Sequence, residues 1–210
     1  MKSTLFNMVA VLFTITLIAS AGVGAVNMIT EDAIAEANRQ ATVAAVANVL
    51  PAFEKSEMST MTIDDMPINI YTAVDGSGAV VGYAVETMTM SGFSGKVRMM
   101  VGFDAEGTIL NVNVLEQSET PGLGSKMCDE GNVLLASVQG KNPANLKLKV
   151  KKDGGDIDAL TAATISSRAY ADAVARAYEA FKVASGAQES TDGVSGATEG
   201  HDAQEGGDNE

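Results

Sequence analysis

An uncharged apolar run near the N-terminus constrains this chain more than any other feature. Residues 5–29 contain no charged side chain. As a helix they would extend about 37 Å, which exceeds the roughly 30 Å hydrocarbon thickness of a bilayer. The run therefore predicts a single-pass transmembrane anchor at residues 1–29.

A cleaved signal peptide is the alternative interpretation of the same run. Lys2 would form its positive region, and Ala19-Ser20-Ala21 is similar to a small-residue cleavage site. The apolar run continues well past that site, so the anchor is favoured. Under either interpretation the positive flank stays in the cytoplasm and the rest of the chain lies across the membrane.

Composition excludes several classes of function. The formal net charge of −13 over 210 residues argues against a nucleic-acid partner, which needs clustered Lys and Arg. A single cysteine, Cys128, excludes an internal disulfide and a cysteine-ligated metal cluster within this chain. The one histidine, His201, lies in a polar C-terminal segment. We therefore assign no catalytic residue and no metal ligand.

Residues 30–184 predict one α+β domain with an antiparallel sheet flanked by helices. Thr30 is suited to cap a first helix, which Pro51 ends. Two turn-forming clusters, residues 75–78 and 104–107, each separate two β-type runs and predict hairpins. An apolar stripe of Tyr170, Val174, Ala177 and Phe181 predicts a helix over residues 166–184. The expected strands are residues 70–74, 80–86, 96–103 and 108–115, with residues 146–150 as a short fifth candidate.

Residues 185–210 have a different composition. They carry seven acidic residues, no Lys or Arg, many glycines and no apolar period. Such a segment cannot bury enough apolar surface to offset the entropy of ordering it. We expect it to be a disordered acidic tail.

The most informative segment for chemistry is residues 158–167. Thr161 and Thr164 flank two alanines, and the predicted helix begins immediately afterwards. On capping chemistry alone, Thr164 or Ser166 would cap that helix. Alternatively, free backbone N–H groups and the helix dipole would suit a phosphoryl group there, with small neighbours leaving the Thr164 hydroxyl accessible.

This segment resembles the flavinylation motif of covalent FMN-binding domains. The resemblance implies that a flavin transferase moves FMN from FAD onto Thr164, producing a phosphoester. Asp158 corresponds to the leading acid of the motif and Ser166 to its following hydroxyl. Thr161 stands where the family has Ser, and Ala162 stands where it has Gly. An alanine would be strained if that position requires a positive φ.

A second segment, Asp192-Gly193-Val194-Ser195-Gly196-Ala197-Thr198, matches the core of the motif more literally. It lacks the trailing hydroxyl, and no helix is predicted after it. Thr164 is therefore favoured as the main acceptor, and Thr198 is the alternative.

Residues 116–126 form a third segment of interest. Pro121-Gly122 predicts a tight turn after a strand. The string Ser-Glu-Thr-Pro-Gly-Leu-Gly at residues 118–124 resembles the loop that these FMN domains place over the flavin. By this resemblance, polar groups or backbone amides would meet the ring edge, glycines would allow close approach and a leucine would pack on the ring face. The residues implied are Glu119, Thr120, Gly122, Leu123 and Gly124.

The wider resemblance covers residues 1–184. The anchor, the helix end Val49-Leu50-Pro51, and residues 81–86 and 101–104 are similar to the G subunit of Rnf-type electron transport complexes. That family implies an electron-transfer subunit, incomplete as a catalyst alone, in a complex that couples ferredoxin:NAD⁺ electron transfer to Na⁺ or H⁺ translocation. Its expected partners are the other membrane subunits and a flavin transferase. The domain would lie on the periplasmic side of the bacterial cytoplasmic membrane.

Two other functions stay open on the sequence. One is the C subunit of a sodium-pumping NADH:quinone oxidoreductase, which shares the flavin motif but is usually longer. The other is a flavin-free, membrane-anchored assembly module, which the departures at Thr161 and Ala162 favour. The presence of both flavin segments, about 40 residues apart and in family order, favours the electron-transfer subunit over the module.

Overall fold

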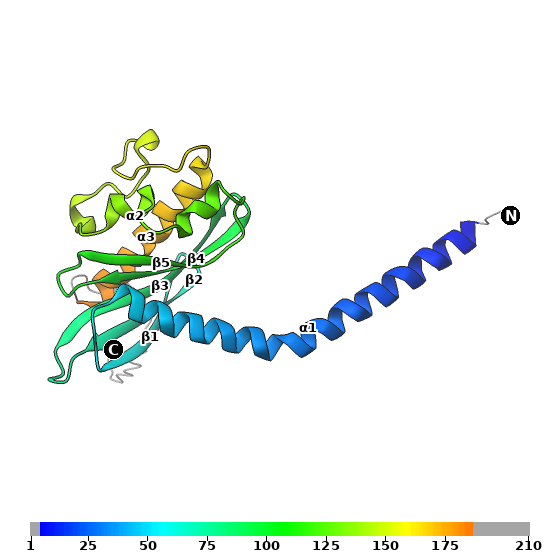
Figure 1. Ribbon diagram of the computed structural model, residues 1–210, viewed down its shortest axis with the longest axis horizontal. Helices are drawn as coiled ribbons and strands as arrows, with labels where there is room; N and C mark the ends of the chain where they lie inside the picture. The colour runs from blue at the N-terminus through cyan, green and yellow to red at the C-terminus, as the bar shows by residue number, and fades with distance from the viewer. Residues whose placement is uncertain (1–4, 187–210) are drawn as a thin grey trace, which may run out of the picture.

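The computed structural model describes residues 5–186, and it begins with one long helix, α1 (Leu5–Val49). Within that part of the chain, α1 is the one helix that is long and apolar enough to cross a membrane. It bends about midway and then runs onto one face of the domain (Figure 1). The predicted cap at Thr30 is wrong, because the Thr30 hydroxyl donates to the Val26 carbonyl at 2.9 Å inside the continuous helix. The predicted boundary between residues 29 and 30 thus falls within this helix, whereas the predicted end before Pro51 is confirmed.

Five antiparallel strands follow as a meander in the order β1-β2-β3-β4-β5. Sequential hairpins produce this order because each strand pairs with the next one along the chain. The four predicted strands at residues 70–115 are confirmed, with longer bounds. The strands are β1 (Lys55–Ile63), β2 (Met66–Val74), β3 (Val80–Gly92), β4 (Gly95–Phe103) and β5 (Ile109–Gln117).

Strand β1 was not predicted, because it is an edge strand with a mostly exposed, polar sequence. Its turn into β2 is made by Asp64 and Asp65, with φ of 50° and 60°. Two successive positive φ values are typical of a type I′ hairpin turn, and Asp tolerates this conformation better than most residues do. Sequence reasoning looks for Asn-Gly or Asp-Gly at such a turn, so Asp-Asp gave a weak signal.

The expected strand at residues 146–150 is wrong. This segment folds back locally, with Lys149 N–H donating to the Lys147 carbonyl and Ile157 N–H donating to the Lys149 carbonyl. It joins only an isolated bridge between Val150 and Ile157. The alternation of Leu and Lys is typical of a strand and therefore misled the prediction. In the structure, local hydrogen bonds and not a neighbouring strand satisfy the backbone of this segment.

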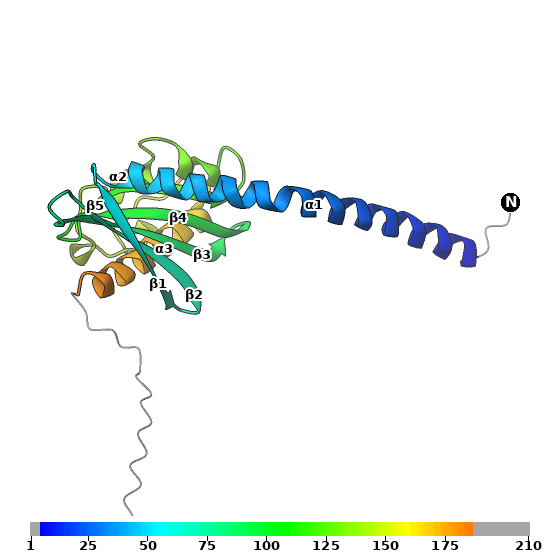
Figure 2. The same cartoon turned by 90° about the horizontal axis from the view of Figure 1, so that it is seen from below.

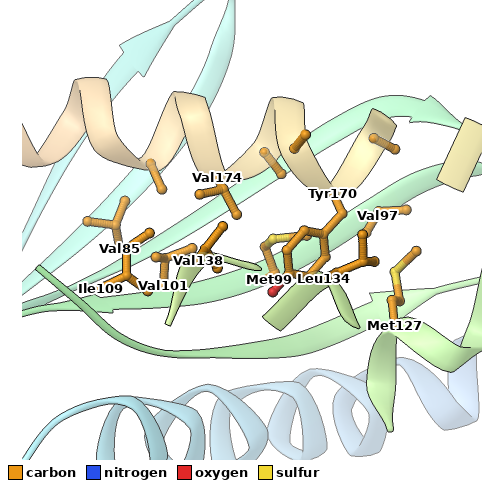
Figure 3. Packing of buried hydrophobic residues seen from close by; sticks show 14 of the residues in the cluster. Val85, Val97, Met99, Val101, Ile109, Met127, Leu134, Val138, Tyr170 and Val174 are labelled. Carbon is orange, nitrogen blue, oxygen red and sulfur yellow. The ribbon is translucent and has the colours of Figure 1, made fainter. Parts of the chain in front are cut away.

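Helices cover both faces of the sheet (Figure 2). Helix α3 (Thr164–Ala184) lies on one face, and the last turns of α1 lie on the other. On the α3 side, Figure 3 shows Tyr170 and Val174 pointing toward strand residues such as Val85, Met99 and Val101. The short helix α2 (Val133–Val138) contributes Leu134 and Val138 to this core. All four residues of the predicted apolar stripe are buried, so the α+β layering is confirmed.

Three short 3-10 turns complete the chain between β5 and α3. They are η1 (Gly124–Cys128), η2 (Pro143–Asn145) and η3 (Lys151–Asp153). The predicted acidic tail and Thr198 lie outside the described residues, apart from Ser185 and Gly186.

Candidate functional site

The two segments that the sequence singled out meet at one cavity of about 320 Å³. One wall is the loop after β5, the second is the N-terminus of α3, and the third is the turn between β3 and β4. Its lining residues are Phe93, Thr120, Leu123, Gly124, Ala162, Ala163, Thr164, Ile165 and Ser166. The volume is at the small end of the range for ligand pockets, and the mixture of apolar side chains with a few polar groups is typical of them.

The N-terminus of α3 opens into this cavity without a cap. The N-cap residue is Ala163, and no side chain caps the helix. The predicted cap by Thr164 or Ser166 is therefore wrong. The first helical hydrogen bond runs from Ser167 N–H to the Ala163 carbonyl at 3.0 Å. The N–H groups of the preceding residues consequently have no helical acceptor, and together with the helix dipole they favour an anion.

The two hydroxyls of this helix turn have different surroundings. Thr164 is half-buried and lines the cavity. Ser166 also lines it, but its side chain is 2% exposed and its hydroxyl donates to the Glu119 carboxylate. Ser166 is thus hydrogen-bonded within the protein, and Thr164 is the more exposed of these two residues.

Ala162 adopts the left-handed conformation, with φ of 59°. By the resemblance described above, glycine is the expected residue at this position. A left-handed conformation costs a residue with a β-carbon about 1–2 kcal/mol. The loop before α3 is therefore strained at Ala162, two residues before Thr164.

A buried serine fixes the loop that carries this strain. The Ser167 hydroxyl accepts a hydrogen bond from Leu160 N–H at 2.9 Å and donates one to the Ala163 carbonyl at 2.9 Å. Ser167 is fully buried. Sequence reasoning missed this role, because a serine near a helix start gives no signal that its hydroxyl bonds the backbone of the preceding loop.

Four of the predicted site residues do not line the cavity. Thr161 is exposed. Gly122 donates its N–H to the Ser125 hydroxyl at 2.9 Å within the loop after β5. Asp158 forms an ion pair with Lys151 at 2.7 Å. The hydrogen bond from Lys151 lowers the pKa of the Asp158 carboxyl, because it favours the charged form. Asp158 therefore supports the loop and does not face the cavity.

Glu119 is the fourth of these residues, and it lies behind the cavity wall. Its side chain is 4% exposed and accepts hydrogen bonds from the backbone N–H groups of Phe93 and Ser94. Phe93 was missed by sequence reasoning, although it lines the cavity and is 65% exposed. An exposed aromatic residue in the turn Ser91-Gly92-Phe93-Ser94-Gly95 is the signal that could have indicated it.

Comparisons with known proteins identify the family of this domain. The model of the FMN-binding domain family matches residues 92–179, which include every lining residue. The G subunit of the ion-translocating oxidoreductase complex of Shewanella amazonensis is 35% identical over 76% of this chain and 80% of its own length. The equivalent protein of Shewanella baltica is 32% identical over 84% of this chain and 89% of its own.

One further relative and one solved structure also match. The G subunit of the Na⁺-translocating ferredoxin:NAD⁺ oxidoreductase complex of Acetobacterium woodii is 28% identical over 84% of this chain and 91% of its own length. The crystal structure of Shewanella oneidensis NqrC matches with a TM-score of 0.37 and 21% identity, over 63% of this chain and 65% of that chain.

Proposed function

Because this chain belongs to the family of G subunits of ion-translocating oxidoreductase complexes, we propose that it carries electrons through FMN attached covalently to Thr164. Membership and the FMN-binding domain make the chain a flavoprotein electron-transfer subunit of such a complex. It is one subunit among several and not a complete catalyst. The covalent bond, the acceptor residue and the coupling ion are the parts that we propose.

The observation that supports attachment at Thr164 is the uncapped N-terminus of α3 beside its hydroxyl. Free N–H groups there would hold the phosphate of FMN, and the helix dipole would stabilise its negative charge. Thr164 would accept the phosphoryl group through its side-chain oxygen. The new bond is a phosphoester, the pyrophosphate bond of FAD breaks, AMP leaves and the hydroxyl proton is released.

The other lining residues would hold the ring system. Leu123, Ile165 and Phe93 supply apolar surface at the open side of the cavity. Thr120 and the backbone of Gly124 supply polar groups near it. When bound, FMN supplies reversible electron transfer, and the protein sets its potential through hydrogen bonds and burial.

The anchor explains how the domain would work with its partners. We propose that α1 keeps the domain at the membrane beside the other subunits, which raises its effective concentration there. Lys2 precedes the apolar run and acidic residues follow it. By the positive-inside rule this charge pattern supports an orientation in which the domain would lie on the periplasmic side, where a flavin transferase would load it. The complex would couple ferredoxin:NAD⁺ electron transfer to movement of Na⁺ or H⁺.

The test is expression of the full chain together with a flavin transferase, followed by intact mass and peptide mapping. We expect an added FMN on the peptide that contains Thr164. Thr164→Ala should abolish the fluorescent flavin band on a denaturing gel, and Thr198→Ala, the matched control, should keep it. A band that persists in Thr164→Ala and disappears in Thr198→Ala would move the cofactor to the tail. Absence of any added mass would favour the flavin-free assembly module.

A further inference from the structure

One buried carboxylate joins the three walls of the cavity. Glu119 follows β5 and accepts a hydrogen bond from Phe93 N–H at 3.2 Å and another from Ser94 N–H at 2.9 Å, in the β3–β4 turn. It also accepts the hydroxyl of Ser166 from the first turn of α3. These segments lie 25 to 47 residues away from Glu119 along the chain.

Two glycines pack closely against the Glu119 side chain. A β-carbon on Gly92 would lie 2.8 Å from Glu119 Oε1, and one on Gly124 would lie 2.9 Å from Oε2. Both distances are too short for real contacts. A β-carbon on Gly92 would also meet the Gly95 carbonyl, and one on Gly124 would also meet the Ser166 hydroxyl, so the two glycines leave room for Glu119 together with these neighbours. A carboxylate that is 4% exposed needs compensating donors, and these three donors supply them.

We propose that Glu119 is a positioning residue, which fixes Phe93 at the mouth of the cavity relative to the Thr164 helix turn. This inference rests on the proposed function, because the group that Phe93 would pack against is the flavin ring. The resemblance assigned Glu119 to flavin binding, but its oxygens point to the protein's own donors and it does not line the cavity. Glu119 acts through Phe93, whose side chain is exposed at the rim and free to contact a planar ring.

The first experiment measures the clasp, meaning the three hydrogen bonds to Glu119, without any flavin. Hydrogen–deuterium exchange of the Phe93 and Ser94 amides would be compared in the full chain, Glu119→Gln and Glu130→Gln. Glu130 is an exposed glutamate, so its substitution makes the same change of charge as a matched control. The Gln side chain has one acceptor oxygen, and its NH₂ group only donates. It therefore cannot accept hydrogen bonds at both terminal atoms, as the Glu119 carboxylate does. We expect these two amides to exchange about tenfold faster or more in Glu119→Gln, and to be unchanged in Glu130→Gln.

The second experiment measures positioning in the flavin-loaded protein. Iodide quenching of flavin fluorescence and the visible flavin spectrum would be recorded for Glu119→Gln, Phe93→Ala and the double variant. Phe93 is exposed, so its truncation should leave the fold intact. We expect both single variants to increase quenching and to shift the spectrum. We expect the double variant to match Phe93→Ala, because the two substitutions remove one shared effect.

The outcomes separate this inference from the proposed function. If no flavin is attached to Thr164, the proposed function fails. The exchange experiment still shows whether Glu119 holds the Phe93 and Ser94 amides. If exchange at Phe93 and Ser94 in Glu119→Gln equals that of Glu130→Gln, the clasp is refuted. If the double variant shows the sum of both spectral changes, Glu119 does not act through Phe93. Should Glu119→Gln fail to fold, Ser166→Ala removes a single donor and should still accelerate exchange of the two amides.

Discussion

Ala162 offers the sharpest test of how the loop before α3 is built. Its φ of 59° places a residue with a β-carbon in the left-handed region. Replacing it with glycine would remove about 1–2 kcal/mol of strain. Glycine also makes the unfolded chain more flexible, which costs about 0.4–1 kcal/mol. The midpoints of these two ranges give an expected net stabilisation of about 0.8 kcal/mol for Ala162→Gly.

The assay is thermal unfolding of the full chain in detergent, with Ala159→Gly as the matched control. Ala159 lies in the same loop and is exposed, and it does not adopt a positive φ. Its substitution therefore carries only the entropic cost and should lower the free energy of unfolding. For a domain of this size, 1 kcal/mol corresponds to about 2–4 °C in Tm. Opposite signs for the two variants are the expected result.

A destabilisation by Ala162→Gly equal to that of Ala159→Gly would refute the reasoning, since strain at Ala162 would then contribute nothing. The same variant has a functional expectation. If the flavin transferase needs this loop in its left-handed conformation, glycine should populate it more readily. Time courses of flavin attachment should then be faster for Ala162→Gly than for the native chain, with Thr164→Ala as the blank.

Three further substitutions test other parts of the structure. Ser167→Ala leaves the buried Leu160 N–H without its acceptor and should cost about 1–3 kcal/mol in denaturant unfolding, with slower flavin attachment. Arg176→Met removes the ion pairs of Arg176 with Asp64 at the β1–β2 turn and with Asp172 on α3; because both carboxylates are accessible to solvent, the cost should be about 1 kcal/mol by chemical denaturation. Asp75 has a lowered pKa because the Ser77 hydroxyl and nearby backbone N–H groups bind its charged form. The charged Asp75 carboxylate stabilises the fold at pH values above its unfolded pKa, and this contribution is lost as the pH falls through the lower folded pKa. The difference in Tm between the native chain and Asp75→Asn should therefore disappear on acidification below about pH 4.

Much of the fold could be predicted because its signals are local. Turn clusters such as residues 75–78 fix hairpins through the preferences of a few neighbouring residues. The stripe on α3 fixes which face is buried. Strand β1 could not be predicted because its exposed, polar sequence carries no apolar alternation and its Asp64-Asp65 turn is a weak hairpin signal. The segment at residues 146–150 has the alternation of a strand, but in the described part of the chain no strand lies beside it to pair with.

The candidate site divides in the same way. The sequence by itself showed three features: the apolar run of the anchor, the alternation of apolar and polar residues along the strands, and the two short segments that resemble flavin motifs. Only the tertiary structure decided that Thr164 opens into the cavity while Ser166 is bound by Glu119. It also decided that Ala162 is left-handed and that Phe93 stands at the rim. The physical reason is that a side chain's type fixes which bonds it is able to make, whereas its partner depends on which distant backbone folds beside it.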